Sequence, residues 1–563
     1  MKRISAVALV CVLVLSLGTM CAAKDHSPAD VTARHGMVAA ANELASQAGT
    51  EILKEGGNAV DAAVATAFAL NVVESNASGI GGGGFMLIRM AGSDKVVAID
   101  YREKAPAAST PDKFASEEAK KNNISEFSPF AVGVPGTVAG MVMALDKYGT
   151  MSLAQVMAPA IRLAEEGFPL ARVTSESAKD HFDTLTKFND PSKFVFFTNG
   201  LPAEPGTIIK QPNLAKAFRL IAKDGRKAFY EGPIGEAMIK RLQELGGKMT
   251  MEDLKNYEAV IREPAEGTYR GYKIFSMSPP SSGGVTLVEI LNIMENFPVS
   301  EWGYNSPRTI HYMAEAYKMA FADRSKFLGD PDFLTIPLKG LTSKEYAKVL
   351  AGKIRPFEAM KQVSTGDPSM YEHFSTTHAS VADAKGNLVA FTQTVNDFFG
   401  SSIIEPEYGF VLNNEMDDFS SNPESVNAPG PGKRPLSSMS PSIVLDPEER
   451  PFLVAGTPGA WRIITSMAEI ITNLVDFHMS MDEAIEAPRF TCRSIGGKPD
   501  ALQVESRIPE QTLVLLKLRG HDIKVRSDYD LYFGGAQGIL FDPVKDILIG
   551  GADSRRDGVA VGY

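Results

Sequence analysis

The sequence contains little cysteine, and this scarcity limits the covalent chemistry that the chain can use. Only three cysteines occur in 563 residues, and two of them, Cys11 and Cys21, lie within the first 23 residues. Cys492 is the third, so we expect no disulfide within the mature protein. No catalytic cysteine motif surrounds Cys492, and we interpret it as a structural thiol.

An excess of positive charge and a long apolar run are also missing. The chain has 57 Lys and Arg against 68 Asp and Glu, a formal net charge of -11. This balance disfavours nucleic acids and anionic membrane surfaces, because both attract basic patches. After the first 23 residues, no segment is long and apolar enough to cross a bilayer. We therefore expect no nucleic-acid partner and no membrane span in the mature protein.

Motifs of several enzyme classes are absent as well. No G-x-S-x-G nucleophile elbow occurs, and none of the eight histidines has zinc-ligand spacing. The run Gly79–Gly84 satisfies G-x-G-x-x-G, but a helical stretch precedes it and the strand-like Phe85–Ile88 follows. A dinucleotide site requires the opposite order. We interpret the run as a tight backbone crossing, and we predict no metal and no cofactor.

The first 23 residues have the organisation of an export signal. Lys2-Arg3 is a basic start, Ile4–Leu17 is apolar, and Cys21-Ala22-Ala23 is a small-residue cleavage zone. The bulky Met20 argues against lipoprotein anchoring at Cys21. We predict a signal peptide over residues 1–23 and a secreted or periplasmic bacterial protein.

Helical and strand-like patterns occupy different parts of the remaining chain. Helical periodicity dominates the first two thirds, whereas the residues after Phe374 form strand-like segments separated by Gly, Asn and Pro. This distribution predicts a layered α+β or α/β architecture with helices outside and strands inside. Ser420–Gly432, rich in Ser, Asn, Pro and Gly, is typical of a loop. The expected helices span 44–54, 58–70, 153–166, 234–245, 285–294, 309–327, 463–475 and 481–487.

Two strand-like runs that flank Asp383-Ala384-Lys385-Gly386 predict a β-hairpin. Asp-x-x-Gly is typical of a type I turn whose glycine is left-handed and forms a bulge. Such a turn pairs its first residue with Asn387 and places Thr376 opposite Thr394, with Cβ atoms about 5 Å apart. Asn396 then projects from the same face. A slip of one residue would move Thr394 to the other face.

An ordered set of motifs resembles the γ-glutamyltransferases, also called γ-glutamyltranspeptidases, a family of N-terminal nucleophile hydrolases. The likeness runs from about residue 35 to the C-terminus, in the family's order, and the ordered set is more specific than any single motif. The motifs are Ser78–Phe85, Tyr101-Arg102-Glu103, Ala105-Pro106, Pro279–Gly284, Thr376-Thr377-His378, Leu412–Phe419, Lys433–Pro441, Gly456–Gly459 and Glu486–Phe490.

The resemblance implies the fold and the processing of the chain. The family fold is an αββα sandwich, with two stacked central sheets covered by helices and one core built from both processed subunits. The implied cleavage site lies between Ser375 and Thr376. Cleavage would give a large subunit of residues 24–375 and a small subunit of residues 376–563, which remain together as a heterodimer.

The resemblance also implies the catalytic groups. The hydroxyl of Thr376 first attacks the carbonyl of Ser375, giving an ester that water opens. The freed α-amine of Thr376, with a pKa of about 7.7–8.0, can then accept the hydroxyl proton. The Thr394 hydroxyl would orient the nucleophile, and the backbone N–H groups of Gly459 and Ala460 would form the oxyanion hole.

Recognition of a γ-glutamyl donor requires partners for one carboxylate and one ammonium group. By resemblance, Arg102 binds the carboxylate through a bidentate fork, helped by two serines. Glu415 and Asp418 supply negative charge for the ammonium, and an asparagine amide accepts from it. The expected substrate-binding residues are Arg102, Asn396, Glu415, Asp418, Ser437 and Ser438.

The expected activity is γ-glutamyl transfer from glutathione or related compounds to amino acids, peptides or water. The chain departs from the family in two respects. Ala460 stands where many relatives have glycine, which keeps the backbone donor but changes the φ/ψ preference. Ser420–Gly432 is shorter than in relatives that carry a lid, so we expect the lid-less type, with a cleft open to bulky acceptors.

Two alternatives stay open. A related self-processing cephalosporin acylase would need a pocket for a dicarboxylic acyl group without the ammonium, and Glu415 and Asp418 argue against it. A periplasmic solute-binding protein fits the signal segment and the acidic charge, but it does not explain the motif at Thr376.

Overall fold

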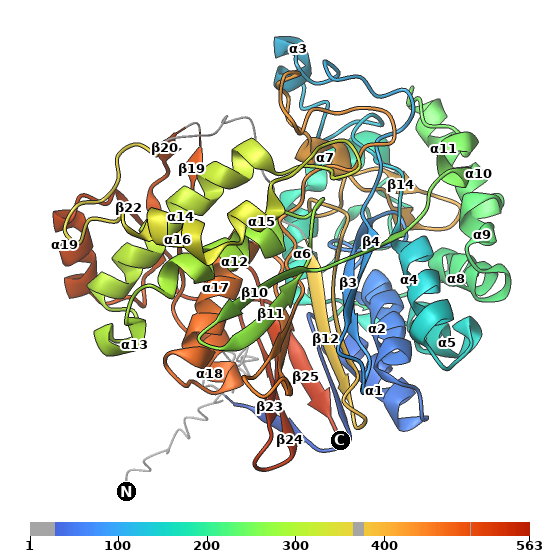
Figure 1. The fold of residues 1–563 in the computed structure, drawn as a ribbon. Helices are drawn as coiled ribbons and strands as arrows, with labels where there is room; N and C mark the ends of the chain where they lie inside the picture. The colour runs from blue at the N-terminus through green and yellow to red at the C-terminus, as the bar shows by residue number, and fades with distance from the viewer. Residues whose placement is uncertain (1–28, 364–375, 496) are drawn as a thin grey trace, which may run out of the picture.

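The computed structural model describes residues 29–363, 376–495 and 497–563. The predicted signal peptide and Ser375 therefore lie outside the described residues. Two seven-stranded sheets stand at the centre, and helices lie on both sides of them (Figure 1). Among the described residues, no helix is both long and apolar enough to cross a bilayer.

Each central sheet is antiparallel and combines strands from both ends of the chain. The first sheet has the order β1 (Val31–Ala33), β24 (Ile547–Ala552), β23 (Gln537–Asp542), β17 (Pro451–Gly456), β16 (Ser442–Leu445), β11 (Tyr272–Ser276) and β10 (Ala265–Tyr269). The second has the order β25 (Val559–Gly562), β2 (Gly36–Ala40), β12 (Thr377–Asp383), β13 (Leu388–Thr394), β3 (Gly83–Arg89), β4 (Val96–Tyr101) and β9 (Val260–Arg262).

The two sheets stack face to face between two helical layers. Strand β12 contacts β17 and β23 of the first sheet, and helices cover the outer face of each sheet. One hydrophobic core fills the space between the sheets and continues over the outer face of the first sheet, and another fills the outer face of the second. This is the αββα sandwich that was predicted. The covering helices include α1 (Glu43–Lys54), α2 (Ala59–Val73), α4 (Thr137–Tyr148), α12 (Gly283–Met294), α17 (Arg462–Val475) and α18 (Met481–Glu486).

All eight predicted helices are present, with ends displaced by at most about three residues. The start of α2 shows why the prediction succeeds. Asn58 Oδ1 accepts from the Val60 amide at 2.8 Å, and Asp61 Oδ2 accepts from the Asn58 amide at 2.8 Å, forming a capping box. Helix α4 was not predicted, because Gly136 at its start gives no side-chain cap.

The other helices are α3 (Glu117–Lys121), α5 (Leu153–Glu166), α6 (Arg172–Asp180), α7 (Phe182–Phe188), α8 (Pro212–Asp224), α9 (Lys227–Tyr230), α10 (Pro233–Glu244), α11 (Met251–Lys255), α13 (Val299–Trp302), α14 (Pro307–Phe327), α15 (Leu338–Leu341), α16 (Lys344–Ala351), α19 (Glu510–Leu518), η1 (Glu415–Asp418) and η2 (Leu531–Phe533). The short strands are β5 (Phe168–Pro169), β6 (Phe197–Thr198), β7 (Leu201–Pro202), β8 (Ile208–Ile209), β14 (Ile404–Glu405), β15 (Phe410–Val411), β18 (Phe490–Thr491), β19 (Ser494–Ile495), β20 (Lys498–Pro499), β21 (Leu502–Glu505) and β22 (Ile523–Arg526).

The predicted hairpin register is confirmed. Strands β12 and β13 pair antiparallel with Thr377 opposite Gln393, and the turn glycine, Gly386, has φ 84° in the left-handed region. Continuing this register by one residue sets Thr376 opposite Thr394. Because side chains alternate along a strand, both threonines point to the same face of the sheet.

The glycine run before β3 is the close backbone crossing that was predicted. A Cβ atom on Gly82 would lie 2.0 Å from the carbonyl oxygen of Thr394, and one on Gly81 would lie 2.2 Å from that of Val411. Both distances are far below a normal contact, so no larger residue fits without moving the neighbouring backbone. The run therefore helps to place the end of β13, where Thr394 lies.

Cleavage before Thr376 should leave the two fragments associated. Strands β12 and β13 lie between β2 and β3 in the second sheet, and both neighbours precede the cleavage site. Separation would break five backbone ladders, three in the second sheet and two in the first, and would expose the core on both faces of the second sheet. We expect the cleaved protein to elute as one species in size-exclusion chromatography, and to split only in denaturant. Two separate peaks in native buffer would contradict this account of the core.

Candidate active site

One small cavity gathers side chains that lie far apart in the sequence. Its volume is about 20 Å³, close to the space that one water molecule needs. Nine of the predicted catalytic and substrate-binding residues line it, and Gly459 adjoins one of them. Met439 and Ile463 also line the cavity and were not predicted. The full lining is Arg102, Thr376, Thr394, Asn396, Glu415, Asp418, Ser437, Ser438, Met439, Ala460 and Ile463.

The two threonines are buried at one end of this cavity. Thr376 is 4% exposed and Thr394 is 2% exposed. The backbone amide of Asn396 donates to Thr394 Oγ1 at 2.8 Å, which fixes the direction of that hydroxyl. The Asn396 side chain donates through Nδ2 to the carbonyl of Asn414 at 3.1 Å, so its Oδ1 is the acceptor it can offer. A bond from Thr394 to the Thr376 hydroxyl stays a prediction.

The Arg102 side chain is held by carboxylates of the same site. The residue directly follows β4 and is 1% exposed. Its two terminal nitrogens donate to Glu415 and Asp418, which belong to the single turn η1. Its Nε donates to the Pro435 carbonyl at 3.3 Å. The predicted partners of the substrate carboxylate and of the ammonium are therefore partners of one another in this structure.

Burial changes the protonation of the acidic residues around Arg102. It raises the pKa of Glu415 well above the usual range, although Arg102 opposes this shift. It also raises the pKa of Glu103 to about 7, with Arg102 again opposing. A neighbouring carboxyl, Asp417, has its pKa raised to about 7 by burial as well. A buried carboxylate without a cation is costly, so the negative charge of this site depends on its partners.

The segment that follows Arg102's backbone partner Pro435 brings two serines, Ser437 and Ser438, to the cavity. The Ser437 amide donates to the Pro280 carbonyl at 3.0 Å, and the Ser437 carbonyl accepts from the Ser282 hydroxyl at 2.6 Å. Arg324 of α14 donates to the Ser438 hydroxyl at 2.8 Å and to the Ser282 hydroxyl at 2.8 Å. Sequence analysis did not predict Arg324, because no local motif marks a residue that acts from a distant helix.

The turn before α17 presents two backbone donors near the cavity. Neither the Gly459 nor the Ala460 amide donates to another described residue. Ala460 has φ 52°, in the left-handed region where a Cβ atom is strained. The concern about Ala460 in place of glycine is therefore justified, since the chain adopts the glycine-like conformation with an alanine.

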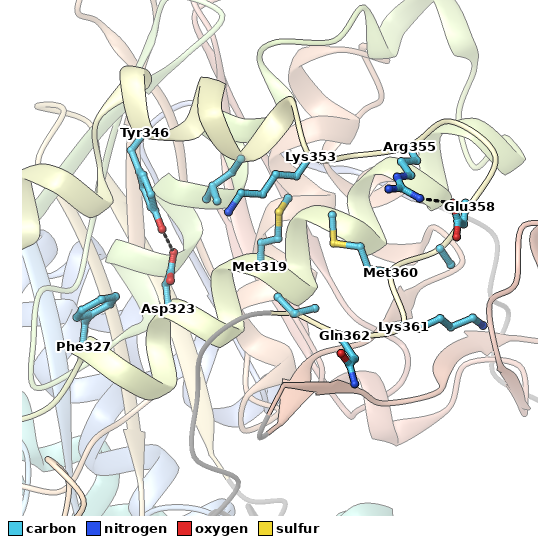
Figure 2. A pocket seen from close by; sticks show the side chains of 13 residues that line it. Met319, Asp323, Phe327, Tyr346, Lys353, Arg355, Glu358, Met360, Lys361 and Gln362 are labelled. Carbon is cyan, nitrogen blue, oxygen red and sulfur yellow. Dashed lines mark hydrogen bonds and ion pairs between the residues drawn. The ribbon is translucent and has the colours of Figure 1, made fainter.

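Other polar clusters do not compete with this site. A cavity of about 470 Å³ lies between α14, α16 and residues 353–363 (Figure 2). None of the predicted residues lines it, and four of its polar side chains pair with one another: the Tyr346 hydroxyl donates to Asp323 at 2.5 Å, and Arg355 pairs with Glu358 at 2.6 Å.

One group within the described residues has donor atoms close enough to hold a metal ion, namely His311, Glu315 and His521. Its members already have partners, within the group and outside it. His311 Nδ1 lies 2.7 Å from His521 Nε2, and Lys318 donates to Glu315 at 2.5 Å. The ammonium of Lys318 would also repel a cation, so this group does not favour a metal centre.

The chain is similar to known proteins in sequence and in structure. Residues 45–563 match the family described as gamma-glutamyltranspeptidase. The chain is 43% identical over 547 residues to a glutathione hydrolase proenzyme of Escherichia coli strain K12, covering 95% of this chain and 93% of that protein. It is 40% identical over 547 residues to a glutathione hydrolase proenzyme of Bacillus subtilis strain 168, covering 94% and 92%. The crystal structure of a cephalosporin acylase from Bacillus halodurans has a TM-score of 0.86 at 30% identity, covering 95% of this chain and 97% of that chain.

Replacing the strained alanine should stabilise the fold. Ala460→Gly removes the Cβ atom at φ 52°, and we expect the free energy of unfolding to rise by up to about 1 kcal/mol. Urea unfolding in a Thr376→Ala background would measure this in an uncleaved chain. The backbone donor remains, so kcat of the cleaved Ala460→Gly enzyme should stay within about threefold of wild type. A drop in stability would show that the alanine is not strained.

Proposed function

Because the chain belongs to the γ-glutamyltranspeptidase family, we propose that it is an exported, self-processing glutathione hydrolase and γ-glutamyltransferase. The observation that carries the proposal is the pairing of Arg102 with Glu415 and Asp418 beside Thr376 and Thr394 in one cavity. That cavity combines a nucleophile with the charges that a glutamyl group requires.

Self-processing requires no group beyond the chain itself and water. The Thr376 hydroxyl attacks the carbonyl carbon of Ser375, the Ser375–Thr376 C–N bond breaks, and the amide nitrogen takes a proton. The resulting ester is hydrolysed, which leaves a carboxylate on Ser375 and a free α-amine on Thr376. The products are a large subunit of residues 24–375 and a small subunit of residues 376–563.

The processed enzyme then uses Thr376 as an N-terminal nucleophile. Its neutral α-amine accepts the hydroxyl proton while the oxygen attacks the γ-carbonyl of the donor. The amides of Gly459 and Ala460 stabilise the negative oxygen of the tetrahedral intermediate, and the Thr394 hydroxyl orients the nucleophile. The leaving amine departs with a proton, and a γ-glutamyl ester on Thr376 remains. Water or the amine of an amino acid or peptide attacks this ester and restores the enzyme.

Donor binding is an exchange of ion pairs. The glutamyl carboxylate takes the place of Glu415 or Asp418 on Arg102, and the freed carboxylate pairs with the glutamyl ammonium. Every buried charge keeps a partner during this exchange, which avoids the penalty of an isolated buried ion. Donors at Ser437 and Ser438 and the Asn396 Oδ1 complete the contacts.

The same argument separates this function from that of the acylase alternative. A dicarboxylic acyl group without an ammonium would pair with Arg102 and leave the displaced carboxylate, Glu415 or Asp418, without a cation. The fold resembles that of a cephalosporin acylase, but fold alone does not decide the substrate. The two carboxylates favour a donor that carries a positive charge.

The loop beside the cavity supports an open, lid-less cleft. Ser420–Gly432 contains no helix or strand. The Asn427 side chain binds the backbone just before and just after the loop. Its Nδ2 donates to the Asp418 carbonyl at 2.7 Å, and its Oδ1 accepts from the Leu436 amide at 3.0 Å. We infer that water and bulky amines both reach the ester on Thr376, so hydrolysis competes with transfer.

Self-cleavage tests the proposed processing directly. The purified wild-type protein should run as two bands of roughly 38 and 20 kDa, in proportion to the lengths of the two subunits in a 60.6 kDa chain. Thr376→Ala removes the attacking hydroxyl, so it should stay a single inactive chain. Cleavage of purified Thr376→Ala before residue 376 would rule out the autocatalytic assignment.

A substrate analogue that lacks the ammonium group tests donor recognition. We expect kcat/KM for glutaryl-p-nitroanilide to be at least about a hundredfold below that for γ-glutamyl-p-nitroanilide, since an unpaired buried charge costs about 3 kcal/mol. Asp418→Asn should reduce the difference between the two substrates, because it removes one of the two carboxylates that the substrate can displace from Arg102.

Asp417→Asn is the matched control for Asp418→Asn. Asp417 belongs to the same turn but does not line the cavity, so this variant should keep the wild-type ratio. Equal rates for the two anilides in the wild-type enzyme would favour the acylase alternative instead.

A further inference from the structure

A second set of contacts holds the nucleophile from outside the cavity. Arg556 donates to the backbone carbonyl of Thr376 at 2.7 Å, and the hydroxyl of Thr377 donates to Glu74 Oε2 at 2.5 Å. Arg556 and Glu74 form an ion pair with a nitrogen–oxygen distance of 3.6 Å. Neither of these two charged residues lines the cavity, and the reaction described above uses neither.

The three residues that make these contacts, Glu74, Thr377 and Arg556, come from separate parts of the fold. Glu74 is the residue at which α2 ends, Thr377 opens β12, and Arg556 lies between β24 and β25. Because side chains alternate along β12, Thr377 points away from the cavity that Thr376 lines. The contacts therefore fix the strand from the side that the substrate does not occupy.

Burial and packing make this arrangement rigid. Glu74 is 6% exposed, and Arg556 is 2% exposed. The Arg556 guanidinium lies 5.4 Å from the centre of the Phe398 ring, and a Cβ atom on Gly535 would lie 2.6 Å from Arg556 Cγ. Little space is left for the arginine to move, so its donor group is fixed relative to the strand.

An ion pair at this depth is a poor means of stabilising the fold. Removing two charges from water costs several kcal/mol, and apolar side chains of similar volume often stabilise a protein more. The pair does supply direction, because a charged donor and a charged acceptor are held at fixed points beside the nucleophile.

We propose that Glu74 and Arg556 are positioning residues that fix the Thr376–Thr377 backbone for self-cleavage and for acyl transfer. This inference rests on the proposed function. Arg556 holds the carbonyl of the nucleophile itself, and Glu74 holds both Arg556 and the hydroxyl of the next residue. After cleavage Thr376 becomes a chain end, so these contacts replace the restraint that the preceding peptide bond supplied. A displacement of about 1 Å can lower a rate a hundredfold.

The charge of Glu74 links this positioning to pH. Burial raises the pKa of Glu74 to about 7, while Arg556 and the Thr377 hydroxyl oppose the shift and Asp557 adds to it. Below pH 7 the carboxyl is mainly protonated, and its ion pair with Arg556 is lost. Because folding raises this pKa from 4.5 to about 7, the contribution of Glu74 to stability is fully present below pH 4.5 and is lost as the pH rises through about 7. Glu74→Gln should therefore not lower stability at pH 8, even though it removes the ion pair.

The rate of self-cleavage as a function of pH tests the proposal. In the precursor the nitrogen of Thr376 is an amide, so its titration does not contribute to the profile. The precursor is produced by cell-free synthesis, and its cleavage is followed on denaturing gels between about pH 5.5 and 9. This pH range extends to both sides of about 7, the pKa of Glu74. We expect the wild-type rate to fall as the pH drops through about 7. At pH 8, Glu74→Gln should cleave at least about tenfold more slowly than the wild type. Its cleavage rate should not fall as the pH drops through about 7.

Glu289→Gln is the matched control for the loss of a buried carboxyl. Burial raises the pKa of Glu289 well above its usual range, and this residue lies on α12, which covers the first sheet. The Glu289→Gln precursor should cleave at the wild-type rate and with the wild-type dependence on pH. Glu103 and Asp417 also titrate near pH 7, and they remain in both variants, so the comparison isolates Glu74.

Three further variants keep the test decisive if Glu74→Gln folds poorly. Thr377→Val removes one hydroxyl without changing the shape of the side chain and should slow cleavage, whereas Thr377→Ser should restore it. In the processed enzyme, Arg556→Lys should lower kcat and leave KM for γ-glutamyl-p-nitroanilide unchanged, since the substrate does not contact it.

The outcomes separate this inference from the function on which it rests. Cleavage of Glu74→Gln and Thr377→Val at the wild-type rate, with the wild-type pH profile, would overturn the positioning role and leave the proposed function intact. A wild-type chain that never cleaves before Thr376 would overturn the proposed function, and the inference with it.

Discussion

The pairing of β12 with β13 is the constraint on which the site depends. Thr377 lies opposite Gln393 in this ladder, and the same register sets Thr376 opposite Thr394 at the edge of the cavity. Both strands lie inside the second sheet, between β2 and β3, so neither can shift without breaking its hydrogen bonds to the neighbouring strands. A nucleophile placed directly before a central strand keeps its position after the chain on its N-terminal side is cut.

Charge is arranged differently on the two sides of this strand. On the cavity side, Arg102 is held by Glu415 and Asp418, the partners that we propose a zwitterionic donor exchanges. On the opposite side, Arg556 and Glu74 hold the backbone itself, and neither of them lines the cavity. The first set is suited to exchange of partners, and the second to a fixed geometry. Burial raises the pKa of Glu103, beside Arg102, and that of Glu74 to about 7, so the protonation around both sets changes near neutral pH.

Local rules predicted much of this architecture. Capping residues and turn chemistry gave the start of α2 and the hairpin register, because both are set by residues close in sequence. The family resemblance named the residues of the cavity. Contacts between distant segments were not predicted: Arg324 reaches Ser438 from α14, and Arg556 reaches Thr376 from the C-terminal segment. Nothing near these arginines in the sequence distinguishes them from surface arginines, so only the fold reveals their partners.

The central claim is that Thr376 carries the γ-glutamyl group during turnover. Brief incubation of the processed enzyme with γ-glutamyl-p-nitroanilide, an acid quench and mass spectrometry of the small subunit would test it most directly. The account predicts an added γ-glutamyl group on the peptide that begins with Thr376, which disappears when an acceptor amine is supplied before the quench. An adduct on any other peptide would contradict the account, and so would an unmodified small subunit during steady release of p-nitroaniline.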